Sequence, residues 1–291
     1  MHYQISHVTR YIYTSPVSVC QNILTLSPRN SHRIQCASHR LRIKPTPVEI
    51  HRRTDFFGNH LAVFSIEENH DDLTIVAHSR VAVQDPAIPA EMTPPSWREV
   101  RAKVMDRIDF HWLTASHFLY DSPRIERADQ YLKYASASFP AEADVLHGTL
   151  DLSRRIHSEF KYESGATHSA TPTGHAFSIR RGVCQDFAHI MIACLRSIGL
   201  SARYVSGYLR TVPPPGQDRL VGADQSHAWV GVYCGPELGW IDFDPTNDCI
   251  CGKDHIPIAW GRDYSDVVPV RGAFLGGGDS RISVSVDVAP I

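Results

Sequence analysis

Residues 181–199 have the sequence RGVCQDFAHIMIACLRSIG, and their pattern predicts a single helix. Apolar side chains recur at helical spacing from Val183 to Ile198. Gly182 comes just before this pattern and Gly199 ends it, as glycines commonly do at helix boundaries. The stretch therefore predicts a helix with Cys184 in its first turn.

Cys184 is the first candidate for chemistry. A helix N-terminus presents unpaired backbone N–H groups and roughly half a positive charge, and both favour a thiolate over a thiol. The same N–H groups can hold a developing oxyanion. The alternative is that Cys184 only packs, which is our interpretation of Cys194 within the apolar stripe. A base from elsewhere in the chain would favour the catalytic interpretation.

Two predicted strands downstream supply such a base and a carboxylate. Residues 226–233 and 239–244 both alternate with a period of two, which is typical of strands. A four-residue loop at 234–237 would place Tyr233 opposite Leu238 and His227 opposite Asp244. The carboxylate would then orient the imidazole, leaving its other nitrogen for Cys184.

Each of these residues also has a simpler interpretation. His227 could be one of many surface histidines, and Asp244 could belong to a turn that ends its strand, because residues 244–247 read DPTN. The three residues together, in this arrangement, favour a Cys184–His227–Asp244 triad.

The rest of the chain predicts an α+β protein. Residues 1–85 read as an antiparallel β-domain with period-two alternation, and residues 86–140 as a proline-rich linker and helical segment. Within that segment Ser122 and Pro123 predict a helix start, with the helix running to about Ser138. Residues 141–291 form the predicted catalytic core with a C-terminal extension. In this part, 161–182 read as a long loop and the tail beyond Cys249 as irregular.

Composition narrows the classes of partner and compartment. The 291 residues are 43% hydrophobic and 21% charged with a net charge of −2, so we expect neither nucleic acid nor a membrane as partner. No apolar run approaches the roughly 20 residues of a transmembrane helix, and the N-terminus does not resemble a secretory signal. We therefore expect a cytoplasmic protein. Its seven cysteines are expected to be free thiols.

Other possible sites are weaker. Cys249, Cys251 and His255 could suggest a metal site, but no second ligand pair stands at finger-like spacing. We therefore expect neither a metal nor an organic cofactor. His168 and His175 are expected at the surface, and Gln185 and Asp186 are expected to cap or support the helix.

Three motifs in order resemble the bacterial transglutaminase-like superfamily: RGVCQDFA at 181–188, HAW at 227–229 and GWIDFDPT at 239–246. Residues 1–85 also resemble the β-rich domain that precedes this core in bacterial members, and WGRDYSDV at 260–267 resembles the segment that follows it. The resemblance implies an N-terminal antiparallel β-domain followed by a papain-like core of helices packed on an antiparallel sheet. It also implies Cys184 as nucleophile, His227 as general base and acid, and Asp244 as the residue that orients the histidine.

Three functions follow as hypotheses. The first is hydrolysis of a peptide, isopeptide or related amide bond through a thioester at Cys184, with a peptide or protein as substrate. The second is transamidation, in which an amine resolves the same thioester. The third is a catalytically silent module that binds peptides. Tyr162, or another residue of the 161–182 loop, is the candidate for the second oxyanion donor.

Overall fold

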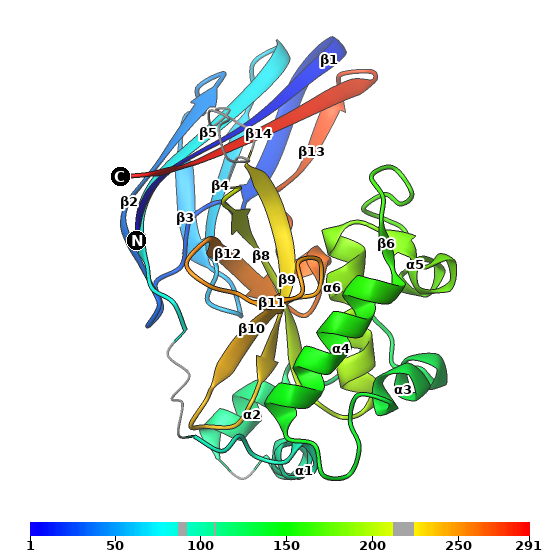
Figure 1. Cartoon of the computed structure of the whole chain (residues 1–291). Coiled ribbons are helices and arrows are strands. Elements are labelled where there is room, and N and C mark those ends of the chain that lie inside the picture. The colour runs from blue at the N-terminus through cyan, green and yellow to red at the C-terminus, as the bar shows by residue number, and fades with distance from the viewer. Residues whose placement is uncertain (87–91, 108, 212–223) are drawn as a thin grey trace, which may run out of the picture.

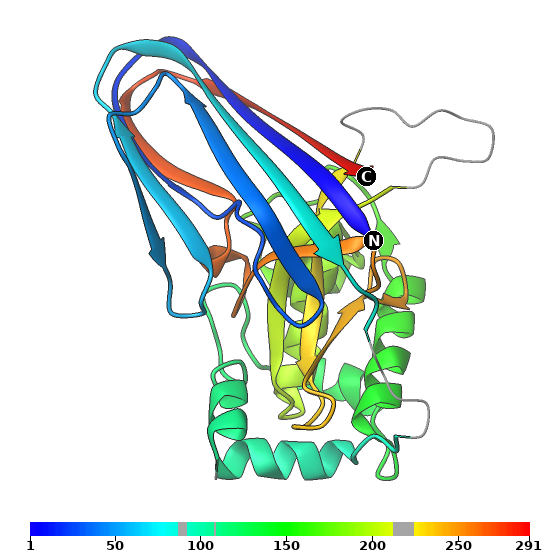
Figure 2. The same ribbon diagram turned by 90° about the vertical axis from the view of Figure 1, so that its left-hand side faces the viewer.

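The computed structural model describes residues 1–86, 92–107, 109–211 and 224–291, and it confirms the α+β fold class. A large curled antiparallel sheet stands at one end of the molecule, and a smaller sheet covered by helices stands at the other (Figures 1 and 2). Among the described residues, no helix is both long and apolar enough to cross a membrane.

The curled sheet is built around one long strand. Its first five strands are β1 (His2–Leu24), β2 (Ile34–Lys44), β3 (Ile50–Thr54), β4 (His60–Ile66) and β5 (His70–Val83). They are hydrogen-bonded in the order β2-β5-β1-β4-β3. Alternating burial along β1 gives this sheet one apolar face, as the period-two pattern predicts. The predicted N-terminal antiparallel β-domain is thus present.

The C-terminus completes this same sheet. Strands β13 (Val270–Gly276) and β14 (Ser280–Pro290) both pair antiparallel with β1. The prediction of an irregular tail beyond Cys249 is therefore wrong. The C-terminal extension also does not belong to the core alone, because its last strands add to the N-terminal sheet (Figure 1).

The segment between the two sheets is helical. It contains α1 (Trp97–Asp106), α2 (Phe110–Ser116), α3 (Asp129–Ser136) and α4 (Val145–Glu159). The predicted helix start at Ser122 and Pro123 is wrong, because Ser122 and Ile125 exchange backbone hydrogen bonds in a turn. The backbone N–H of Arg124 donates to Asp263 Oδ2 at 2.9 Å, a contact with a distant part of the chain. Tertiary hydrogen bonds thus replace the helical ones there.

The core sheet carries the predicted strands. It contains β8 (Ala202–Leu209), β9 (Gln225–Tyr233), β10 (Trp240–Asp244), β11 (Cys249–Ile250) and β12 (His255–Gly261), in the order β11-β10-β9-β8-β12. The predicted helix is α6 (Cys184–Ser197), which packs on one face of this sheet. Ala228, Val230 and Val232 of β9 join the apolar cluster of α6, while Trp229 packs on the opposite side.

The predicted loop at 161–182 is more ordered than its composition suggested. Strands β6 (Lys161–Tyr162) and β7 (Arg181–Gly182) pair in parallel at its two ends. A short helix, α5 (Thr173–Ile179), lies between them. The two ends of the segment are thus fixed beside the start of α6.

Candidate active site

Cys184 is the first residue of α6, as predicted. Asp186 holds this end of the helix: its Oδ2 accepts from the backbone N–H of Val183 at 2.9 Å and from Thr167 Oγ1 at 2.6 Å. A Cβ on Gly182 would lie 2.5 Å from the same Asp186 oxygen, so only glycine fits there. The predicted capping role of Asp186 is confirmed, and it ties the 161–182 segment to the helix.

Gln185 has a related supporting contact. Its Nε2 donates to the backbone carbonyl of Ser169 at 3.1 Å. His168 and His175 are exposed, as predicted. The residues beside Cys184 thus fix the neighbouring loop.

His227 and Asp244 meet, but not through the predicted register. Trp240 lies opposite Tyr233 and Phe243 opposite Val230, so β10 is displaced by two residues from the predicted pairing. The predicted direct opposition of His227 and Asp244 is wrong, and the two residues are diagonal neighbours. A displacement of two residues keeps the same side chains on the same face. His227 Nε2 therefore still donates to Asp244 Oδ2 at 2.8 Å.

Asp244 is fully buried and surrounded by donors. Oδ1 accepts from the backbone N–H groups of Thr246 and Asn247, at 2.9 and 3.3 Å. Oδ2 accepts from His227, from Asn247 Nδ2 at 2.6 Å and from His255 Nε2 at 3.0 Å. Burial alone would raise the pKa of Asp244, but the hydrogen bonds from both histidines hold it well below its usual range.

Sequence reasoning missed the roles of Asn247 and His255 beside Asp244. The DPTN turn was a correct signal for Asn247, because the turn that ends β10 brings this side chain back onto the carboxylate. His255 carried no comparable local signal, since it reaches the site from another strand.

The imidazole of His227 lies between Asp244 and Cys184 in its interactions. His227 is buried, which by itself would lower its pKa, but the hydrogen bond to Asp244 and the proximity of Cys184 raise the pKa to about 10. Because Nε2 is used by Asp244, Nδ1 is the nitrogen left for Cys184. The site thus favours a protonated His227 beside Asp244.

Among the described residues, His227, Asp244 and His255 also lie close enough together to hold a metal ion. One ligand atom each from His227, Asp244 and His255 lies within 4.8 Å of the others. All three residues are buried, and their hydrogen bonds to each other already account for this spacing. Cys249 and Cys251, considered above with His255 and set aside as a metal site, do not belong to this described group.

Tyr162 lies close enough to Cys184 for electrostatic interaction. Burial first, and then the charge of Cys184, raise the pKa of the Tyr162 hydroxyl. Its ring centroid is 6.2 Å from that of Phe187, one turn along α6 from the cysteine. As an oxyanion donor Tyr162 stays a prediction.

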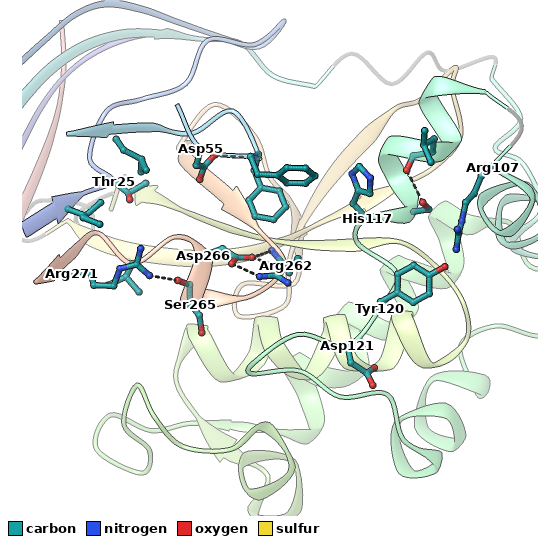
Figure 3. A pocket seen from close by; sticks show the side chains of 17 residues that line it. Thr25, Asp55, Arg107, His117, Tyr120, Asp121, Arg262, Ser265, Asp266 and Arg271 are labelled. Atoms are coloured by element: carbon teal, nitrogen blue, oxygen red, sulfur yellow. Dashed lines mark hydrogen bonds and ion pairs between the residues drawn. The ribbon is translucent and has the colours of Figure 1, made fainter. Parts of the chain in front are cut away.

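A cavity of about 730 Å³ lies in another part of the molecule, beside the N-terminal sheet. Phe56, Tyr120 and Arg262 are among its lining residues, and Arg262 is held by Asp266 at 2.9 Å (Figure 3). Within the described chain, its lining includes none of the three predicted catalytic residues. This cavity and the predicted catalytic residues therefore lie in different places.

A papain-like arrangement, with a cysteine at a helix N-terminus and a histidine–aspartate pair on the adjacent strands, defines the class of this protein. The chain belongs to the transglutaminase-like superfamily: residues 135–245 match the model of that superfamily, and residues 3–82 match the bacterial transglutaminase-like N-terminal region. The predicted resemblance is thereby confirmed.

Three similar proteins illustrate this membership. An uncharacterized protein of Mycobacterium tuberculosis is 39% identical over 295 residues, covering 99% of this chain and 92% of its own. A protein-glutamine gamma-glutamyltransferase of Pseudomonas aeruginosa is 33% identical over 138 residues, which cover 46% of this chain and 20% of that enzyme. The crystal structure of a candidate cysteine protease from Cytophaga hutchinsonii shares the fold, with a TM-score of 0.74 and 23% identity, over 99% of this chain and 90% of that one.

Proposed function

We propose that this protein is a cysteine-dependent acyl-transfer enzyme that hydrolyses a peptide, isopeptide or related amide bond. The observation that carries the proposal is that buried His227 binds Asp244 at 2.8 Å and also lies within electrostatic reach of Cys184. A nucleophile, a base and a group that orients the base are the parts that covalent amide cleavage requires. The proposed partner is a peptide or protein substrate.

Acylation would begin at the sulfur of Cys184. The thiolate attacks the carbonyl carbon of the substrate, a C–S bond forms, and the carbonyl electron pair moves to oxygen. N–H groups at the start of α6 are suited to bind that oxyanion. The C–N bond then breaks as His227 gives its Nδ1 proton to the leaving amine. The products are a free amine and a thioester on Cys184.

Deacylation would use the same residues in reverse. His227, now neutral, takes a proton from water while the water oxygen attacks the thioester carbon. The C–S bond breaks, the acid is released, and Cys184 returns to a thiolate beside protonated His227. If a primary amine attacks in place of water, the product is a new amide, which is transamidation.

Two alternatives are tested together with this proposal. Transamidation is favoured by the partial similarity to the Pseudomonas gamma-glutamyltransferase, which makes glutamine side chains sensible trial substrates. The other alternative is a module that binds peptides without chemistry. Three interacting residues suited to acyl transfer argue against it, since binding alone does not need them.

The test uses a mixture of glutamine-containing peptides, with and without an added primary amine, and mass spectrometry of the products. We expect the wild type to release cleaved or deamidated peptides in both mixtures, and Cys184→Ala to release none. Cys36→Ala is the matched control, because Cys36 is also partly exposed but lies on β2 of the N-terminal sheet. It should behave like the wild type.

The outcomes separate the three functions. Amide-linked amine products at the expense of hydrolysis would assign transamidation. Peptide retention without any product, equal in the wild type and Cys184→Ala, would assign the binding module and contradict the proposal.

A further inference from the structure

His255 reaches the candidate site from the far side of the core sheet. It is the first residue of β12, which pairs with β8 and is separated from β10 by β8 and β9. Its side chain is nevertheless buried against the site, with Nε2 3.0 Å from Asp244 Oδ2. The edge of its ring also packs on Trp229, at 5.3 Å between centroids. A third strand thus supplies a second histidine to the same carboxylate.

The two carboxylate oxygens of Asp244 have different hydrogen-bond partners. Oδ1 is held by two backbone N–H groups of the turn after β10, and these fix the plane of the carboxylate without His255. Oδ2 receives His227, Asn247 and His255 together. Whatever His255 contributes therefore acts on Oδ2, the oxygen that binds His227.

The geometry also fixes how His255 donates. An ionised carboxylate can only accept, so the proton of this hydrogen bond is on Nε2 of His255. Nδ1 of the same ring is buried and has no hydrogen-bond partner among the described residues, so a second proton there would have no acceptor. His255 is thus suited to donate one hydrogen bond, from Nε2 to Asp244.

Other titratable groups near His255 are bound to partners of their own or buried. Asp254, the preceding residue, pairs with Arg210 at 3.3 Å and accepts from the Tyr3 hydroxyl. Burial raises the pKa of Cys249, on β11, to about 11 and that of Cys251 further. The groups that face the ring with charge are therefore Asp244 on β10 and His227 on β9.

We propose that His255 is a positioning residue of this site, which shares Asp244 Oδ2 with His227 and so limits how strongly the carboxylate binds the imidazolium. The inference rests on the proposed function, because it concerns the same His227 and Cys184. A carboxylate oxygen that accepts fewer hydrogen bonds from other donors keeps more negative charge for an adjacent cation, and so binds that cation more strongly. Without His255, Asp244 would hold the His227 imidazolium more firmly, so a higher pH would be needed to remove its proton.

The test follows deprotonation of His227 by 15N NMR of its ring nitrogens between pH 7 and pH 11, in the wild type, His255→Phe and His255→Gln, with the resonance assigned from its loss in His227→Ala. Phe keeps a ring against Trp229 and removes the donor, whereas Gln can donate from Nε2 to the same oxygen. We expect the midpoint of His227 deprotonation to move up by about 0.5 pH unit in His255→Phe, which corresponds to a roughly three-fold higher proton affinity. His255→Gln should have the wild-type midpoint.

Several outcomes would overturn the inference. One is a His227 midpoint in His255→Phe equal to or below that of the wild type, and another is a midpoint in His255→Gln as high as that in His255→Phe. A merely structural role would shift the midpoint in the two variants alike. If circular dichroism shows His255→Phe to be unfolded, His255→Met replaces it, since its flexible side chain also lacks the donor.

Alkylation of Cys184 by iodoacetamide at pH 7, measured in the wild type and His227→Ala, separates this inference from the proposed function. If Cys184 of the wild type reacts no faster than in His227→Ala, the proposed function fails, and the inference fails with it. If the wild type is faster but His255→Phe has the wild-type midpoint for His227, only the inference about His255 fails.

Discussion

At the scale of single residues, the site depends on burying a charged pair with all its hydrogen-bonding groups occupied. Asp244 is completely buried, yet five donors approach its two oxygens. Leaving a buried carboxylate without such partners would cost several kcal/mol. These partners keep Asp244 ionised, and the ionised Asp244 in turn keeps His227 protonated.

This pair predicts how stability depends on pH. The pKa of His227 is raised to about 10 in the folded protein, against about 6.5 in the unfolded chain. The stabilisation is therefore fully present below pH 6.5 and is lost as the pH rises towards 10. We expect the free energy of unfolding to fall by an amount on the order of a few kcal/mol between pH 7 and pH 10.

Urea denaturation at pH 7, 8.5 and 10 measures this loss in the wild type and in His227→Ala. The variant is expected to be less stable at pH 7 but to lose less stability on going to pH 10. Other groups titrate in both proteins, so the difference between the curves isolates His227. Parallel curves would contradict the assignment of the proton to His227.

At the scale of elements, the sequence predicted the identity and order of the parts better than their pairing. Periodicity predicted the α6 helix and the β9 and β10 strands, because each packs one face against the core and the residues of that face are apolar at regular spacing. The register of β9 and β10 depends on the length of the loop between them, and the alternation of apolar residues does not determine that length. The error of two residues left the faces correct, so the predicted pair still met.

Contacts between elements distant in sequence could not be predicted in the same way. The turn at Ser122 is held by Asp263, and the second histidine of the site comes from β12. Neither contact leaves a periodic signal, since each joins one side chain to one distant partner. The helix start at Ser122 was mispredicted, and His255 was considered only as a metal ligand, for this reason.

The start of α6 provides a test at this scale. Gly182→Ala places a methyl group where Asp186 now caps Val183, so we expect the helix start to shift. The free energy of unfolding should drop by about 1–3 kcal/mol, and the reactivity of Cys184 should fall with it. Chemical denaturation and alkylation kinetics measure the two effects.

Gly174→Ala is the matched control. A Cβ at this position would lie 3.6 Å from the Tyr131 hydroxyl, which is ordinary contact. Gly174 also lies within α5, where alanine is favoured over glycine. If both variants behave alike, the close approach of Gly182 to Asp186 is not what positions Cys184.

At the scale of the whole molecule, the curled sheet and the core are joined at both ends of the chain. Tyr3 and Val286 of the curled sheet share an apolar cluster with Ile256 of the core. Elsewhere Asn59, completely buried, accepts from the backbone N–H of Trp260 at 3.0 Å and donates to its carbonyl at 2.8 Å. Arg29 stacks on the Trp260 ring at 3.5 Å. The curled sheet therefore supports the core strand that carries His255.

Asn59→Ala tests this connection. The substitution leaves the backbone groups of Trp260 and the guanidinium of Arg29 without their present partner, so we expect a loss of about 2–4 kcal/mol in the free energy of unfolding. Asn69→Ala, at an exposed position, should change stability by less than about 0.5 kcal/mol. Equal effects of the two substitutions would show that the Asn59 contacts do not join the two parts.

The central claim is that Cys184, His227 and Asp244 act together, and the alkylation rate of each cysteine between pH 5 and pH 9 tests it most directly. Mass spectrometry of iodoacetamide-treated wild type and His227→Ala gives these rates with no need for a substrate. We predict that Cys184 reacts well before Cys36, which is also partly exposed, and remains reactive below pH 7 only while His227 is present. A Cys184 that reacts like Cys36, with no change in His227→Ala, would contradict the account.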